Sequence, residues 1–129
     1  MSYYGTSTKK VDIEDMLGKV FTEIIQDDET ITFVCPEGTF KFEHNQDCCE
    51  NVYIESVVGD LHDLIGSPLL IAVESSNSDI INGKPKSPES HTWTFYKFAT
   101  VKGWVDVRWL GESNGYYSES VELYFTPKE

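Results

Sequence analysis

Hydrophobic and polar residues alternate along most of the chain, a period-two pattern typical of β-strands that bury one face. The pattern predicts eight strands, at residues 20–25, 30–35, 39–44, 51–58, 69–73, 91–101, 104–110 and 119–126. Short, turn-like connections join the first three strands, which indicates an antiparallel meander. Residues 69–73 (LLIAV) form a continuous apolar run, so this segment is expected to be a buried strand.

The alternation is strongest in the C-terminal third of the chain. Residues 91–101 and 104–110 are separated by a turn-forming Lys-Gly pair, so they are expected to form a hairpin. Trp109 shares one face of the second strand with two valines, and Arg108 lies on the opposite face. The face of the first strand that carries Lys97 also carries two aromatic residues, Trp93 and Phe95.

Few segments depart from the strand pattern. A short helix is expected in residues 11–18, ending at a glycine, and one helical turn in residues 60–65. Residues 1–10 are polar and are expected to be flexible, and residues 75–90 hold two of the five prolines and predict a mobile loop. A chain of 129 residues fits one domain. We therefore predict a single, mainly β (α+β) antiparallel domain over residues 11–129, with about seven or eight strands and one or two short helices.

The charge of the chain narrows the classes of partner. With 22 acidic and 10 basic residues, the net charge is −12, which repels nucleic-acid phosphate and anionic membranes. Direct nucleic-acid binding and membrane binding are therefore not expected. The acidity has two interpretations: it keeps the protein in solution, or it forms an acidic face for a basic partner or a nucleic-acid mimic.

The three cysteines, Cys35, Cys48 and Cys49, make a poor disulfide framework because their number is odd and two of them are adjacent. The chain begins without the charged and apolar regions of a signal peptide. Its longest apolar run is far too short to span a bilayer. We therefore expect no disulfide and a reducing cytoplasm.

A cluster of potential metal ligands lies between His44 and Glu50, and His62 and Asp63 follow it. A tetrahedral zinc site needs four suitably spaced ligands, whereas adjacent cysteines in an extended backbone point to opposite faces. A catalytic thiolate needs a neighbouring base or positive charge, and the residues that flank the cysteine pair are acidic. We predict no metal site here and no cofactor; a buried thiol beside a solvated one explains the pair.

Residues 111–120 hold an Asn-Gly turn surrounded by aromatic and hydroxyl side chains. One interpretation is an ordinary hairpin loop; the other is the rim of a site for a planar heterocycle, with flat rings for stacking and polar groups for hydrogen bonds. The candidate ligand-binding residues are Trp109, Ser113, Asn114, Tyr116, Tyr117 and Ser118.

Two cations on neighbouring strands, Lys97 and Arg108, complete the candidate site. Beside a carboxylate such as Asp106, the arginine would be structural; otherwise its guanidinium could bind a phosphate with two hydrogen bonds. The chain carries no dinucleotide-binding, phosphate-loop, zinc-protease or serine-hydrolase motif, and no nucleophile and base stand out. An enzyme is therefore not the favoured class, and no catalytic residue is assigned.

Three strings of the sequence, HNQDCCENVYIESVVGDLHDLIG, SHTWTFYKFATVKG and VRWLGESNGYYSESV, resemble a family of small uncharacterised proteins encoded by bacteriophages and prophages. The resemblance covers most of residues 17–123 and transfers no activity. It implies a phage accessory gene expressed in the cytoplasm of a bacterial host. Proteins of this size and context often disable host defences.

Two functions follow as hypotheses. The first is a non-catalytic binder that sequesters a small nucleotide-derived signal, using the C-terminal loop and its cations. The alternative is an acidic inhibitor, or nucleic-acid mimic, that binds a host defence protein. A homo-oligomer is left open, because oligomer contacts could bury an anionic ligand in so acidic a protein.

Overall fold

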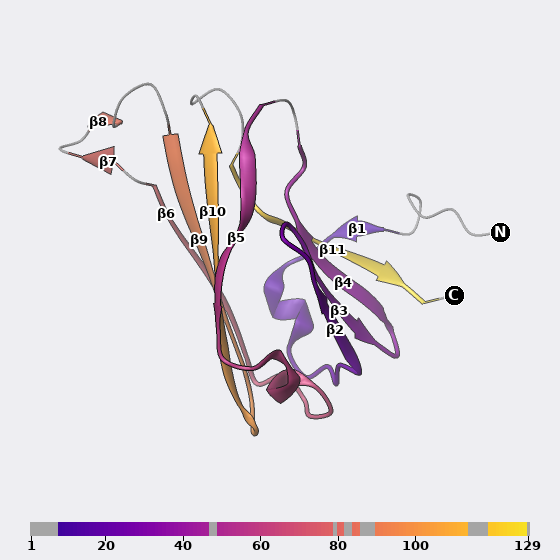
Figure 1. Cartoon of the computed structure of the whole chain (residues 1–129). Coiled ribbons are helices and arrows are strands. Elements are labelled where there is room, and N and C mark those ends of the chain that lie inside the picture. The colour runs from indigo at the N-terminus through magenta and orange to yellow at the C-terminus, as the bar shows by residue number, and fades with distance from the viewer. Residues whose placement is uncertain are drawn as a thin grey trace.

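The chain folds into two antiparallel β-sheets that pack face to face. The structure, a computed structural model, describes residues 8–46, 49–78, 80–81, 84–85, 90–113 and 119–128. The five-stranded sheet has the order β1 (Lys9–Lys10), β11 (Glu122–Pro127), β4 (Gly38–Glu43), β3 (Ile31–Cys35), β2 (Glu23–Gln26). The four-stranded sheet has the order β5 (Asn51–Val58), β10 (Gly103–Ser113), β9 (Ser90–Thr100), β6 (Ile71–Ser78). Figure 1 shows the two sheets as separate layers, which confirms the predicted antiparallel β-domain.

The remaining elements are short. Two 3-10 turns, η1 (Ile13–Met16) and η2 (Leu61–Leu64), stand where the sequence predicted short helices. A small two-stranded sheet is formed by β7 (Ile80–Ile81) and β8 (Lys84–Pro85). Among the described residues, no helix is long and apolar enough to cross a membrane.

The strand pairs follow the sequence closely in two places. β2, β3 and β4 pair in chain order as the predicted meander, and β9 and β10 form the predicted hairpin. The hairpin register places Lys97 opposite Asp106 and Phe95 opposite Arg108. Directly opposite side chains on an antiparallel pair touch, so this register decides which charges meet at the surface.

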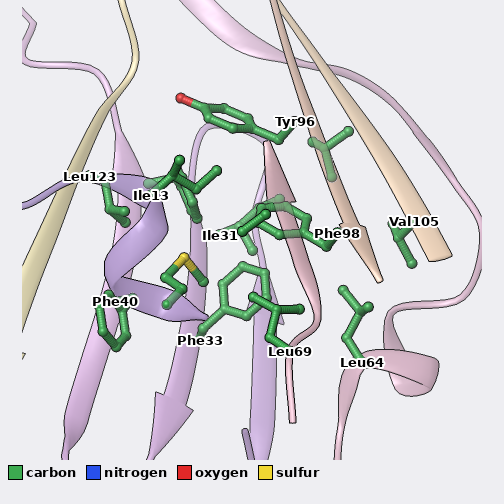
Figure 2. Packing of buried hydrophobic residues seen from close by; sticks show 14 of the residues in the cluster. Ile13, Ile31, Phe33, Phe40, Leu64, Leu69, Tyr96, Phe98, Val105 and Leu123 are labelled. Atoms are coloured by element: carbon green, nitrogen blue, oxygen red, sulfur yellow. The ribbon is translucent and has the colours of Figure 1, made fainter. Parts of the chain in front are cut away.

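Aromatic rings fill the space between the sheets (Figure 2). Phe33 of β3 lies 5.1 Å from Phe98 of β9, measured between ring centroids, and Phe42 of β4 lies 4.7 Å from Tyr96 of β9. Such pairs contribute about 0.5–1.5 kcal/mol each beyond the area they bury. Trp109 is also fully buried in this core. We call the opposite side of the four-stranded sheet, which points away from the core, the outer face.

Three expectations are corrected by the structure. Residues 69–73 are not a fully buried strand, because β6 is an edge strand with one side on the core and Ile71 and Val73 exposed on the other. Residues 75–78, expected in a loop, continue β6 because they keep pairing with β9. Lys9 and Lys10, expected in a flexible terminus, pair with β11 instead.

Candidate functional site

The outer face carries a hollow of about 520 Å³, a size typical of small-ligand sites. All strands of the four-stranded sheet contribute to it. Side chains alternate between the two faces of a strand, so the residues whose side chains point away from the core lie together on this face. The side chains that form it are Ser56, Val58, Val73, Ser75, Phe95, Lys97, Asp106 and Arg108.

The outer face exposes an unusual amount of apolar surface. Val58, Val73 and Trp104 are each more than half exposed, and Ile71 and Phe95 are also exposed. Single exposed apolar residues are ordinary, whereas a contiguous patch marks an interaction surface. The strand registers place these residues on one surface of the sheet, which we call the apolar patch. The charged pair Lys97 and Asp106 interrupts it, because these two residues stand between Val58 and Val73.

Lys97 sits over the indole of Trp104, with its Nζ 5.0 Å from the ring centroid. It also lies directly opposite Asp106 in the hairpin register. The ring and the carboxylate both favour a cation at this position. Lys97 is one of the residues that line the hollow.

Arg108 also lines the hollow, but its guanidinium is engaged by a carboxylate. Its Nε and Nη2 lie 2.8 and 2.6 Å from Oε1 of Glu55, and its Cζ lies 5.2 Å from the ring centroid of Trp93. The sequence suggested a structural pairing with a carboxylate such as Asp106; the arginine is paired with a carboxylate, but the partner is Glu55. A register shift between Arg108 and the next residue offsets β5 against β10, and β5 supplies the carboxylate instead. The pair is partly exposed and contributes at most about 1 kcal/mol.

Trp109 does not take part in a surface site. Its side chain is fully buried in the core, so its ring is not available for stacking on a ligand, and the predicted role is corrected. The alternation had placed it on the same face of β10 as two valines, and that face is buried in the core. Within the described part of the chain, its indole Nε1 has no hydrogen-bond partner.

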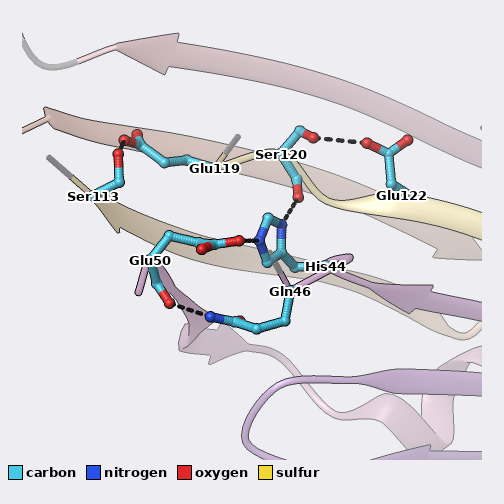
Figure 3. Close-up of polar contacts among 7 residues, drawn as sticks. All are labelled: His44, Gln46, Glu50, Ser113, Glu119, Ser120 and Glu122. Carbon is cyan, nitrogen blue, oxygen red and sulfur yellow. Dashed lines mark hydrogen bonds and ion pairs between the residues drawn. The ribbon is translucent and has the colours of Figure 1, made fainter. Parts of the chain in front are cut away.

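Ser113 is turned inward as well. Its hydroxyl donates a hydrogen bond to the carboxylate of Glu119 (Figure 3). The Thr92 hydroxyl donates to the other oxygen of that carboxylate at 2.7 Å. Glu119 is buried, so these hydrogen bonds replace the water it lost. The other predicted loop residues, Asn114, Tyr116, Tyr117 and Ser118, lie outside the described residues.

The segment from His44 to Glu50, which holds several potential metal ligands, forms a buried histidine–carboxylate pair. His44 Nε2 lies 2.7 Å from Glu50 Oε2, and His44 Nδ1 lies 2.6 Å from the backbone oxygen of Ser120 (Figure 3). Gln46 donates to the backbone oxygen of Glu50 at 2.6 Å. His62 lies elsewhere, exposed on η2 beside Asp60. Within the described ranges, no group of three or more potential ligands is arranged to hold a metal ion.

The expectation of no disulfide is contradicted at Cys49, which is disulfide-bonded. An odd number of cysteines argues against a full framework, but it leaves two free to pair. Cys35 is a buried free thiol, and burial raises its pKa, as does a hydrogen bond with Glu37. Cys48 lies outside the described residues.

Sequence reasoning found the two cations of the hollow but missed several other contributors. Val58 and Val73 come from strands outside the hairpin, and only the sheet order brings Val73 beside Lys97 and Val58 beside Asp106. The alternation of Trp93, Phe95 and Lys97 on one face was the one signal that pointed to this surface. Glu50 and Glu119 were read as ordinary acidic residues, and nothing local distinguishes a buried carboxylate from a solvated one.

Comparison with known proteins gives one match. A family model described as "Domain of unknown function (DUF7448)" matches residues 14–123. No curated protein and no solved structure matches the chain.

Proposed function

The chain belongs to the DUF7448 family of unknown function, and from that premise we propose that it is a non-catalytic binding protein whose outer face binds a basic partner protein. The observation that carries the proposal is the apolar patch of the outer face, where Trp104 is 55% exposed and Val58 is 59% exposed. Tryptophan and arginine dominate the binding energy of protein interfaces, and both are present here.

The charge of the molecule supports a basic partner. At −12, the protein attracts positively charged surfaces and accelerates their association at low salt. The aromatic and aliphatic side chains of the outer face would then supply affinity after the encounter. The two contributions are separable, because salt screens the first and not the second.

The resemblance to phage-encoded proteins suggests the biological setting. In that setting the partner is a host defence protein, and binding in the bacterial cytoplasm blocks it. This is the acidic-inhibitor alternative of the two hypotheses from the sequence. It ranks first now because the outer face is exposed, whereas Trp109 and Ser113 of the nucleotide site are turned inward.

The test compares capture of proteins from a bacterial lysate by the wild type and by two matched variants. Trp104→Ala removes an exposed ring from the outer face, and Ile25→Ala removes an exposed side chain from β2 of the other sheet. We expect a specific protein to be captured by the wild type and by Ile25→Ala, to be lost with Trp104→Ala, and to be captured more weakly in high salt. Equal capture by both variants would exclude the outer face.

The sequestration of a small nucleotide-like ligand is the second candidate, and one observation favours it. Lys97 and Arg108, the cations singled out in the sequence, both line the same hollow, and Phe95 lies directly opposite Arg108. A planar anion could stack on the ring and contact the ammonium group. Against this stands the ion pair of Arg108 with Glu55, which a phosphate would have to displace.

The two candidates are distinguished by incubating the purified protein with cyclic nucleotide signals, heating it and assaying the supernatant. Intact signal released by heat supports sequestration, and altered signal supports an enzyme. If the signal stays free in solution, the nucleotide candidate is refuted and the protein-binding proposal is unaffected. Where binding occurs, Lys97→Ala should weaken it without unfolding the domain.

A further inference from the structure

A second recess, of about 550 Å³, lies where β6 of one sheet faces the segments 10–14 and 120–123 that flank the other sheet. We call it the edge cleft. Its floor is apolar and includes Phe42, Ala72 and Leu123. Its charged lining residues are Lys10, Asp12, Glu14, Glu74 and Glu122.

The edge cleft favours a cation. Four carboxylates line it against one ammonium group, and that group is already paired, since Lys10 Nζ lies 2.5 Å from Glu122 Oε1. Tyr96 donates its hydroxyl hydrogen to Glu74 at 3.1 Å. Burial raises the pKa of Tyr96, and the nearby carboxylate of Glu74 raises it further. The phenol therefore stays protonated and uncharged, and the charge of the edge cleft comes from the carboxylates and Lys10.

Beside the edge cleft runs an unpaired strand edge. β6 is the last strand of its sheet, and within the described ranges it pairs only with β9. Natural edge strands are commonly protected by lysine, proline, other charges or a covering helix. Residues 71–76 (IAVESS) contain neither lysine nor proline; their one charged residue is Glu74, and η1 contacts the strand. The backbone of β6 therefore presents hydrogen-bonding groups that an added strand could pair with.

The edge cleft and the hollow of the outer face meet at this strand. Val73 lines both of them, whereas Ala72 and Glu74 line only the edge cleft. A strand added beside β6 would point alternate side chains to the two sides of the sheet. One set would enter the edge cleft, and the other would extend the apolar patch that begins at Ile71 and Val73.

We propose that β6 is a strand-addition site for an extended segment that alternates lysine or arginine with aliphatic residues. The long stems of the basic side chains pack on Phe42 and Ala72, and their charged heads reach the carboxylates of Glu74 and Glu122. The aliphatic side chains lie against Val73 on the outer face. This inference rests on the proposed protein-binding function and adds the chemistry of the partner.

The probe is a nine-residue peptide of alternating lysine and valine, capped at both ends and labelled, with binding followed by fluorescence anisotropy at low salt. Glu74→Gln keeps an acceptor for Tyr96 but removes a charge, and we expect it to weaken binding about two- to fivefold, the range of one exposed ion pair. Glu23→Gln on β2, the edge strand of the other sheet, is the matched control and should change nothing.

Backbone pairing is tested separately. Peptides N-methylated at alternate residues cannot pair along one edge, so one of the two methylated series should not bind. Hydrogen exchange at residues 71–76 should slow when the unmethylated peptide is added. The inference is overturned if both methylated series bind like the parent, or if Glu23→Gln weakens binding as much as Glu74→Gln.

The outcome is independent of the test of the outer face. If the peptide does not bind while Trp104→Ala still loses its captured protein, strand addition at β6 fails and the proposed function stands. If the peptide binds at β6 while Trp104→Ala keeps its partner, the role of the outer face fails and strand addition stands.

Discussion

Removing the imidazole of His44 should destabilise the protein more than any change to another histidine. The side chains of His44 and Glu50 are 4% and 0% exposed, and the atoms that join them lie 2.7 Å apart. The carbonyl of Ser120 can only accept, so Nδ1 of His44 donates to it, and Nε2 lies within hydrogen-bond distance of the carboxylate of Glu50. The pair joins the end of β4 to the start of β5, and so connects the two sheets.

The expected cost of His44→Ala is about 3–5 kcal/mol, because the variant removes the imidazole that pairs with the buried carboxylate of Glu50. A domain of this size has a total stability of about 5–15 kcal/mol, so the loss is a large share. It corresponds to a fall in Tm of roughly 10 °C or more. Glu50→Gln in the same background removes the buried negative charge that His44 balanced and should restore part of the loss.

Urea unfolding followed by tryptophan fluorescence measures these differences, and a double-mutant cycle over the two positions isolates their coupling. His62→Ala is the control, since His62 is 87% exposed and pairs only with an exposed aspartate; its cost should stay within about 0.5 kcal/mol. The reasoning is refuted if His44→Ala costs no more than His62→Ala, or if Glu50→Gln makes the His44→Ala variant still less stable.

Three further predictions concern the core, one turn and acid stability. Phe98→Ala should cost about 3–5 kcal/mol in urea unfolding because the ring lies between the sheets, whereas Phe95→Ala on the outer face should cost far less; equal losses would contradict the assigned faces. Gly59→Ala should lower the Tm, since its φ is +108° and a Cβ there would lie 2.6 Å from the backbone oxygen of Trp104; an unchanged Tm would refute this conformation. Burial raises the pKa of Glu122, but hydrogen bonds from Lys10 and Ser120 outweigh this effect and hold the pKa below its ordinary 4.5. The ionised carboxylate therefore stabilises the folded protein above pH 4.5, and this stabilisation is lost as the pH falls through the lower pKa of the folded state. Glu122→Gln should therefore flatten the acid limb of the urea midpoint, and an identical pH dependence would show that the pairing contributes nothing.

The strands, the hairpin and the two faces of each C-terminal strand could be predicted from the pattern of residues alone. The direction of a side chain in a strand depends only on its position along the chain, so alternation is readable without any partner. The pairing of β9 with β10 was equally predictable, because a two-residue turn directs the second strand back alongside the first as its antiparallel neighbour. Both cations of the hollow, Lys97 and Arg108, were found in this way.

Which face of each strand is buried in the core, and which polar side chains pair, depended on the fold of the whole chain. A period of two says that a strand has two sides but not which side another sheet will cover, which is why Trp109 was assigned a ligand-binding role although it is buried. Glu55 reaches Arg108 through a register shift, and Ser120 reaches His44 across 76 positions of sequence. Such contacts depend on the packing of the whole chain, because its free energy is a sum over many residues. They therefore cannot be predicted from a local sequence pattern. The position of β6 at the edge of its sheet, on which the strand-addition site depends, is decided in the same way.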